Sequence, residues 1–300
     1  MVSKSFEKPY IAVIGASGFV GSWIFKMAQE KFGADNVLGV YFTKRLNGNC
    51  VDFHQFTERF LNKTQVLLIA AGNSNHNLAE RDFACVYEME TKYIDDIFSK
   101  GFQGFVVYLG SAAIYYGSKA VVDEKDVYPV KNSYGLAKLL AEQTLRCGVK
   151  MSGSRVLIYR LMYAFGEGEK QTRLMTAIKN AVKTGTTLKV FGSGTSYLNP
   201  LPVWFVAQIL VKSVNLIQEQ TKEIEVCNLA HELPVRVIDV VEFMRKNFDL
   251  KYELWGNESY PVEFYVNVAK LKDFLSRMGE RFPDVWTEMY KFVAGGSTGE

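Results

Sequence analysis

A glycine-rich turn near the start of the chain constrains the fold most. The sequence Gly15-Ala-Ser-Gly18-Phe-Val-Gly21 follows an apolar run of strand length at 10–14 and precedes a helical pattern over 19–31. Glycines at such a turn let the backbone approach a pyrophosphate, and the free N–H groups that begin the helix attract its charge. This order predicts a dinucleotide-binding α/β fold. The residues expected to contact the dinucleotide here are Gly15, Ser17, Gly18, Phe19, Val20 and Gly21.

The rest of the chain alternates between strand and helix character. Strands are predicted near 37–42, 65–71, 104–110, 154–160, 187–191 and 224–228, and helices near 79–100, 133–148, 170–184, 202–219, 236–248, 267–277 and 283–293. Such alternation is typical of a parallel sheet covered by helices on both faces. We therefore expect a Rossmann-type doubly wound sheet in a dinucleotide-binding domain at 1–165. A smaller α/β substrate lobe should occupy 166–294, with the chain crossing back to the sheet, before a flexible tail at 295–300.

Composition narrows the possible classes of function. The 300 residues include 35 basic and 32 acidic side chains without a long basic run, which argues against a nucleic-acid or membrane-surface binder. No apolar run approaches the ~20 residues that a membrane span needs. Cys50, Cys85, Cys147 and Cys227 are widely spaced and form no metal-ligand pattern with the three histidines. We expect a cytoplasmic protein with reduced thiols and no metal.

Tyr134 and Lys138 lie four residues apart in a predicted helix, which places both side chains on one face. A fixed positive charge beside a phenol favours the phenolate, and such a pair can exchange a proton with a carbonyl oxygen. An exposed amphipathic helix also produces this spacing by chance. Ser111 favours the first interpretation, because it ends the apolar run 104–110 and ligands of open α/β sheets bind at the carboxyl ends of strands.

The glycine turn, Ser111, Tyr134 and Lys138 together resemble the short-chain dehydrogenase/reductase superfamily, within it the extended nucleotide-sugar epimerase, dehydratase and reductase branch. The resemblance continues through 155–168, 188–194 and 226–243 and so covers nearly the whole chain. It implies that Tyr134 is the proton donor and acceptor and that Ser111 hydrogen-bonds the reacting oxygen. It also implies that Lys138 stabilises the phenolate and binds the nicotinamide ribose.

The end of the second predicted strand bears on the choice of cofactor. Folds that prefer NAD usually place an acid there to bind the ribose hydroxyls, whereas this chain has Thr43, Lys44 and Arg45. Cations favour a 2′-phosphate, so we expect a preference for NADP(H), with NAD(H) possible; alternatively, the two cations only solvate a loop. By resemblance, Asp52 and Phe53 contact the adenine. The remaining expected cofactor contacts are Ala70, Ala71, Gly72, Tyr134 and Met162.

Departures from the family pattern narrow the expected reaction. Ala112 and Ala113 follow Ser111 where the 4,6-dehydratases have an Asp-Glu pair, and Ala113 also replaces the cysteine of the combined 3,5-epimerase/4-reductases. Neither alanine can move a proton. Reduction of the keto group of a nucleotide-activated 4-keto-6-deoxy sugar by hydride transfer is the expected activity. A redox-neutral 4-epimerase with tightly held NAD and a non-catalytic dinucleotide-binding sensor or scaffold are the alternatives.

Other departures concern the substrate. Tyr163 stands where family members usually have an asparagine, and Leu198 aligns with their diphosphate-binding arginine, which puts nucleotide recognition in doubt. Arg173, Lys179, Lys183 and Arg236 are the other cations that could meet a diphosphate. The expected partners are a small-molecule substrate and a second copy of the chain in a homodimer. The residues expected to contact the substrate are Asn73, Ser111, Ala112, Ala113 and Tyr163.

Overall fold

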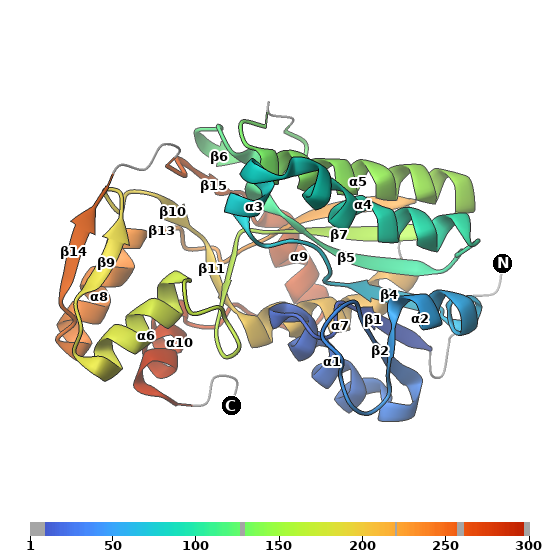
Figure 1. The fold of residues 1–300 in the computed structure, drawn as a ribbon, viewed down its shortest axis with the longest axis horizontal. Coiled ribbons are helices and arrows are strands. Elements are labelled where there is room, and N and C mark those ends of the chain that lie inside the picture. Colours follow the sequence, from blue (N-terminus) through green and yellow to red (C-terminus); the bar gives the residue numbers. More distant parts are fainter. Residues whose placement is uncertain (1–9, 127–129, 220, 257–260, 297–300) are drawn as a thin grey trace. The chain divides into compact units, whose positions relative to one another are not determined.

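In the computed structural model, which describes residues 10–126, 130–219, 221–256 and 261–296, a seven-stranded sheet has the order β12-β7-β5-β4-β1-β2-β3 (Figure 1). Strand β1 pairs in parallel with both β2 and β4, with Ile11 opposite Val37 and Val66. The strand order therefore reverses beside β1, the point at which open α/β sheets bind ligands. The strands are β1 (Ile11–Ile14), β2 (Val37–Tyr41), β3 (Cys50–Asp52), β4 (Val66–Ile69), β5 (Phe105–Ser111), β7 (Arg155–Leu161) and β12 (Ile224–Leu229).

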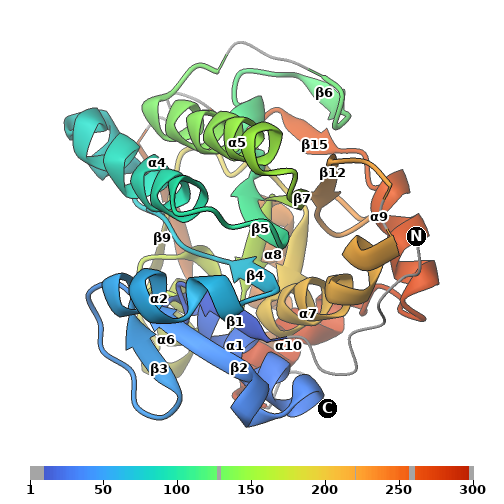
Figure 2. The same ribbon diagram turned by 90° about the vertical axis from the view of Figure 1, so that its right-hand side faces the viewer.

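Helices cover both faces of this sheet, because its strands carry apolar side chains on both faces. One buried cluster joins Ile14, Leu67 and Tyr108 of the strands to side chains of three helices, α2 (Phe53–Arg59), α4 (Phe83–Ser99) and α5 (Ser133–Ser152). The opposite face carries α1 (Phe19–Phe32) and α7 (Val203–Glu219), which is tied to β7 by a 2.7 Å hydrogen bond between the hydroxyls of Tyr159 and Ser213. Figure 2 shows the sheet between α4 and α5 on one side and α1 and α7 on the other.

The chain divides into two compact units. The first comprises Met1–Gly110, Leu136–Tyr159 and Ala207–Val226, and the second comprises Ser111–Gly135, Arg160–Val206 and Cys227–Glu300. Apart from the ends of three strands of the large sheet, the second unit consists of short paired strands and helices. Its paired strands are β6 (Ala120–Val122) with β15 (Phe264–Val266), β8 (Tyr163–Phe165) with β11 (Pro200–Pro202), β9 (Leu188–Phe191) with β14 (Tyr252–Trp255), and β10 (Tyr197–Leu198) with β13 (Val235–Arg236). Its helices are α6 (Leu174–Thr184), α8 (Val237–Phe248), α9 (Ala269–Arg277) and α10 (Val285–Ala294).

Three sequence-based expectations need correction. The helix expected over 79–100 is two helices, α3 (His76–Arg81) and α4, because the side chain of Asp82 accepts the N–H of Cys85 and begins a new helix. The strand expected at 187–191 pairs with β14 and not with the large sheet. The seventh position of that sheet belongs instead to β3, which is only three residues long and has no apolar periodicity to reveal it.

The tail expected at 295–300 lies outside the described residues from 297 onward. Within the described ranges, none of the helices combines the length and apolar character that crossing a bilayer requires.

Candidate active site

The glycine turn lies between the ends of β1, β2 and β4. The N–H groups of Gly15 and Ala16 donate to the carbonyl of Val40, at 2.9 and 3.1 Å. Gly15 has φ +87°, and a Cβ at this position would lie 2.7 Å from the carbonyl oxygen of Ala70. A Cβ on Gly21 would lie 2.0 Å from the carbonyl oxygen of Gly15. Only glycine fits at both positions, because an added Cβ would collide with backbone atoms of the protein itself.

A cavity of about 560 Å³ opens beside this turn in the first unit. Eight of the residues expected to bind the cofactor line it: Gly15, Ser17, Gly18, Thr43, Phe53, Ala70, Ala71 and Gly72. The sequence analysis missed six other lining residues, which come from the end of β2 and from α4: Phe42, Glu88, Met89, Lys92, Tyr93 and Asp96. For the residues of α4, only the helical periodicity could have indicated a face turned toward this cavity.

Aromatic rings form part of the wall of this cavity. The rings of Phe42 and Phe53 stack with centroids 5.1 Å apart, and Tyr93 presents an edge to each of them at 5.7 and 6.3 Å. Such a wall offers flat apolar surface to a heterocyclic base. Phe42 is 43% exposed, so part of its ring is available to a ligand.

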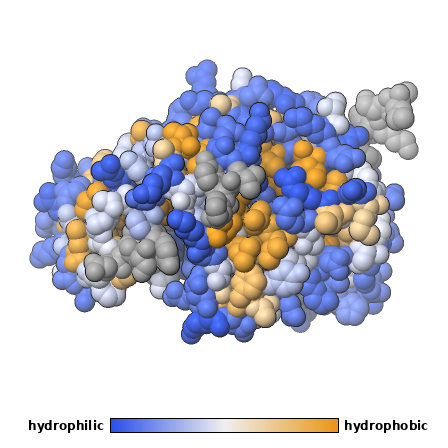
Figure 3. Space-filling view, turned by 90° about the horizontal axis from the view of Figure 1, so that it is seen from above, coloured by the Kyte–Doolittle hydropathy of each residue, from blue (hydrophilic) through white to orange (hydrophobic). Residues whose placement is uncertain are grey.

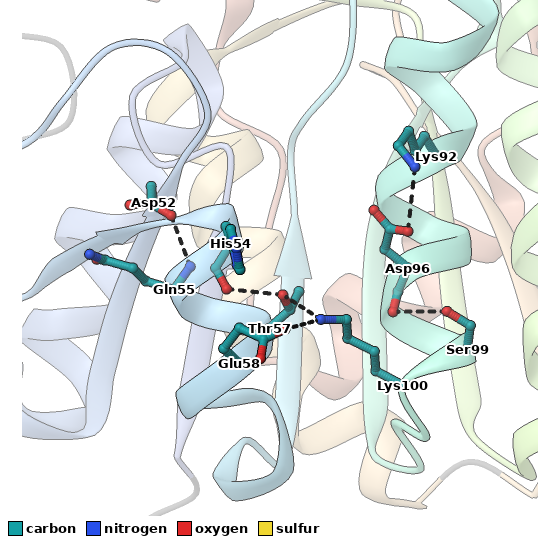
Figure 4. Close-up of polar contacts among 9 residues, drawn as sticks. All are labelled: Asp52, His54, Gln55, Thr57, Glu58, Lys92, Asp96, Ser99 and Lys100. Carbon is teal, nitrogen blue, oxygen red and sulfur yellow. Dashed lines mark hydrogen bonds and ion pairs between the residues drawn. The ribbon is translucent and has the colours of Figure 1, made fainter.

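Asp52, by contrast, serves the fold. Its carboxylate accepts the N–H of Gln55 at 2.8 Å and begins helix α2 (Figure 4). On the cavity side of α4, Lys92 and Asp96 pair at 3.7 Å.

Lys44 and Arg45 are exposed in the loop after β2, directly following the cavity residue Thr43. Phe19 and Val20 belong to the first turn of α1, and Met162 follows β7. None of these three lines the cavity of the first unit.

Ser111 and Tyr134 lie on two segments of the second unit that pack closely together. Ser111 ends β5, and its hydroxyl accepts the N–H of Ala113 at 3.1 Å in a short helical turn, Ala112–Tyr115. A Cβ on Gly135 would lie 2.4 Å from the carbonyl oxygen of Ala113. This close approach brings the first turn of α5, which carries the buried Tyr134, against the turn that follows Ser111. Lys138 lies one turn further along α5.

Lys138 has a partner that sequence reasoning did not find. Its Nζ lies 2.6 Å from Oε1 of Glu90, and the two side chains are 7% and 0% exposed. The same Oε1 accepts the N–H of Asn73 at 2.7 Å. Glu90 shares a helix face with the buried residues Val86, Tyr93, Ile94 and Ile97. A single acid within an apolar stripe was the available signal.

The negative charge of Glu90 contributes to raised pKa values of two tyrosines in this buried region. Burial is the main reason that the pKa of Tyr93 lies well above its ordinary value, and the charge of Glu90 raises it further. Burial likewise raises the pKa of Tyr108, with added contributions from Tyr93, Glu90 and Glu142. Both phenols therefore stay neutral at physiological pH.

The expected substrate residues are arranged differently. Asn73 is buried, and its side chain exchanges hydrogen bonds of 2.8 and 2.9 Å with the backbone of Asn75. Ala112 and Ala113 are buried in the turn after β5. The hydroxyl of Tyr163 donates to Glu169 at 3.0 Å, while Arg173 lies 4.8 Å above the ring. Tyr163 and Asn73 thus both use their polar atoms within their own units.

The position of the missing diphosphate arginine is occupied by the core of the second unit. Leu198 is half-buried on β10 and packs against the apolar cluster of that unit. On the paired strand β13, Arg236 lies opposite Tyr197 and donates to its hydroxyl at 3.2 Å. Among the four residues of this pair of strands, Arg236 is the cation.

Comparisons with known proteins identify the family of the chain and similar folds. The model of the NAD dependent epimerase/dehydratase family matches residues 11–199. Similar solved structures include MoeE5 in complex with UDP-glucose and NAD (17% identity over 95% of this chain and 97% of that one, TM-score 0.82). They also include the UDP-glucose 4-epimerase of Thermotoga maritima with UDP-glucose (14%, 95% and 97%, 0.82) and the dTDP-glucose 4,6-dehydratase DesIV of Streptomyces venezuelae with NAD and TYD (13%, 95% and 95%, 0.81). At these identities the likeness concerns the fold.

Proposed function

Because the chain belongs to the NAD dependent epimerase/dehydratase family, we propose that it is an NADP(H)-preferring oxidoreductase that reduces the keto group of a nucleotide-activated sugar. The observation that carries this proposal is the close packing of the Tyr134 turn of α5 on the turn after Ser111, where only Gly135 fits. The hydroxyls of Tyr134 and Ser111 would then meet a carbonyl oxygen from neighbouring segments, with Lys138 one turn further along α5.

The first unit fits a dinucleotide. Its turn has glycines where an added Cβ would collide with neighbouring backbone. Its cavity has an aromatic wall beside Thr43. Gly15 and Gly18 would let the pyrophosphate approach the backbone, and the hydroxyl of Ser17 would donate to it, since the N–H groups of the two glycines donate to the carbonyls of Val40 and Gly15. When bound, a nicotinamide dinucleotide supplies the hydride donor or acceptor. NADP(H) is favoured by Lys44 and Arg45 and by the absence of an acid between Val37 and Arg45.

Each catalytic residue has one task in this proposal. Tyr134 gives a proton to the reacting oxygen or takes one from it, and Lys138 stabilises the resulting phenolate. Ser111 donates a hydrogen bond to the same oxygen. Ala112 and Ala113 hold no proton, which separates this site from one that eliminates water.

Position 198 holds a leucine, so we assign the binding of the substrate's anionic part to cations elsewhere in the chain. Arg236 is supported because it lies on the strand paired with Leu198 and is held by Tyr197 in a 3.2 Å hydrogen bond. A diphosphate would need such charged donors if it left water. Met162 and Asn73 remain proposed contacts of cofactor and substrate.

A redox-neutral 4-epimerase is the second candidate, and the likeness in fold to a UDP-glucose 4-epimerase favours it. Two properties of the purified full chain separate the candidates. A bound nicotinamide that survives purification, with isomerisation of UDP-hexoses and no net cofactor consumption, indicates the epimerase. An empty site that takes up NADPH and consumes it with dTDP- or UDP-4-keto-6-deoxy sugars indicates the reductase. Binding of neither cofactor would reject both.

We also propose a homodimer. Figure 3 shows a largely hydrophilic face interrupted by apolar side chains. Helices α4 and α5 expose four large apolar residues, Tyr87, Met89, Leu136 and Met151, of which Met89 also lines the cavity. A second copy could cover such side chains. Sedimentation equilibrium of the full chain tests this directly, since a monomer at micromolar concentration would contradict it.

A further inference from the structure

Glu90 is a fully buried acid in the middle of helix α4, although the rest of that helix face is apolar. Removing a carboxylate from water is unfavourable unless charged or N–H partners replace the water. Its Oε1 has two such partners, Nζ of Lys138 at 2.6 Å and the N–H of Asn73 at 2.7 Å. Buried ion pairs are poor stabilisers compared with apolar packing, so this pair suggests a functional reason.

The second oxygen of Glu90 lies beneath the loop that borders the cavity. A Cβ on Gly72 would lie 2.4 Å from Oε2, so this position accepts no side chain while Glu90 is in place. Oε2 is buried and has no hydrogen-bond partner among the described residues. The carboxylate therefore connects the cavity border, Gly72–Asn73, to the ammonium of α5.

We propose that Glu90 is the positioning residue of Lys138: its carboxylate holds the ammonium against the border of the dinucleotide cavity and limits the positive charge that reaches Tyr134. This inference rests on the proposed function, because it assigns a role to Glu90 through Lys138 and Tyr134. In this site the negative charge of Glu90 partly offsets the positive charge that Lys138 presents to Tyr134.

Other charged or titratable groups packed around Glu90 come from the neighbouring elements. Tyr93 lies on α4 and Tyr108 on β5, and both are neutral phenols whose pKa values burial holds high. Glu142 lies on α5, one turn after Lys138, and is also buried. None of these adds a positive charge, so while Lys138 keeps its proton Glu90→Gln raises the net charge around it by one.

The sign of the expected effect follows from this charge. Glu90→Gln keeps the shape and an oxygen for the N–H of Asn73 but removes the negative charge. The phenolate of Tyr134 is then favoured, so the titration midpoint of Tyr134 should fall. Lys138→Met should have the opposite effect. Glu90→Asp keeps the charge on a shorter side chain and should shift the titration by less than half as much as Glu90→Gln.

Tyrosine-selective ¹³Cζ NMR of the full chain without cofactor or substrate measures this titration. Tyr134→Phe identifies the resonance, and thermal unfolding confirms that each variant folds. Glu288→Gln is the matched control, because Glu288 is a buried carboxylate that pairs with Lys291 at 3.3 Å and accepts a hydrogen bond from Trp204. It should leave the titration of Tyr134 unchanged.

Two results would overturn the inference in different ways. If Lys138→Met raises the titration midpoint of Tyr134 while Glu90→Gln leaves it unchanged, Glu90 is only a structural partner and the proposed function stands. If Lys138→Met also has no effect, the Lys138–Tyr134 pair of the proposed function fails together with the role of Glu90. A downward shift in Glu90→Gln, partial in Glu90→Asp and absent in Glu288→Gln, supports the role assigned here.

Discussion

The residues expected to contact ligands differ in kind between the two units. In the first, the cavity combines small residues that leave the backbone open, such as Gly15, Gly18 and Gly72, with a wall of aromatic side chains. In the second, the expected substrate residues Ser111, Ala112 and Ala113 are small, whereas Tyr163 donates to Glu169 and Leu198 packs against the apolar cluster within the unit. Backbone cradles suit a ligand shared by many proteins, whereas large side chains make recognition particular to one chain.

The largest expected effect separates chemistry from cofactor binding. Tyr134→Phe removes one hydroxyl and keeps the ring, so turnover should fall by about 10²–10⁴-fold, the range expected for general acid catalysis. The affinity of the first unit for a dinucleotide should hardly change. Steady-state rates and fluorescence titration with NADPH measure the two quantities. If the variant kept more than about a tenth of the wild-type rate, the loss would be smaller than general acid catalysis requires, and Tyr134 would not be the proton donor.

The next test concerns the backbone cradle. Gly15 and Gly153 both have left-handed backbone, with φ +87° and +72°, but only Gly15 has atoms within 4 Å of an added Cβ. Alanine at either position should cost about 1–2 kcal/mol of unfolding free energy through backbone strain. Gly15→Ala should cost more because of Ala70 and should abolish dinucleotide binding. Equal losses in chemical denaturation would mean that the close approach does not matter.

A smaller effect is expected at the exposed cations after β2. Replacing Lys44 and Arg45 with glutamine should weaken NADPH more than NADH, because only NADPH carries the extra phosphate. Each charge-assisted contact contributes about 1.5–3 kcal/mol before solvent screening, so a selective loss of at least tenfold is expected. Calorimetric titration with both cofactors measures it. An original preference for NADH would show that the two side chains only solvate their loop.

The smallest effect belongs to the second unit. Burial raises the pKa of Glu169, although hydrogen bonds from Tyr163 and Thr176 and the charge of Arg173 lower it. A carboxyl with a raised pKa in the folded state stabilises the protein below its unfolded value of about 4.3, and this contribution is lost as the pH rises through the folded value. Glu169→Gln should therefore cost more unfolding free energy at about pH 4 than at about pH 7.

Glu242→Gln provides the control for this pH dependence. Hydrogen bonds from Arg245 and Tyr252 lower the pKa of Glu242, so its contribution is present at neutral pH and lost on acidification. The cost of its replacement should rise with pH, opposite to that of Glu169. Parallel pH trends for the two variants in chemical denaturation would contradict the assignment of Glu169 as a buried acid.

The sequence predicted the features that depend on local pattern. Gly15, Gly18 and Gly21 were recognisable because a turn between strand and helix needs them, and the apolar periodicity of α5 placed Tyr134 and Lys138 on one face. Glu90 was missed because its partner lies 48 residues away in the sequence. The short β3 was missed because three residues show no periodicity. Which side chains face a ligand in the second unit depends on tertiary packing, as Tyr163 and Leu198 show.

The central claim is that Tyr134 and Lys138 serve a nicotinamide-dependent redox reaction on a nucleotide-linked sugar. A single-turnover experiment tests it: enzyme in excess is mixed with oxidised dinucleotide and a panel of UDP- and dTDP-hexoses, and nicotinamide absorbance is followed. We predict reduced nicotinamide at up to one equivalent per site with at least one sugar, and none with Tyr134→Phe. If the wild type binds the dinucleotide but no sugar yields reduced nicotinamide, or if Tyr134→Phe yields as much, the claim is contradicted.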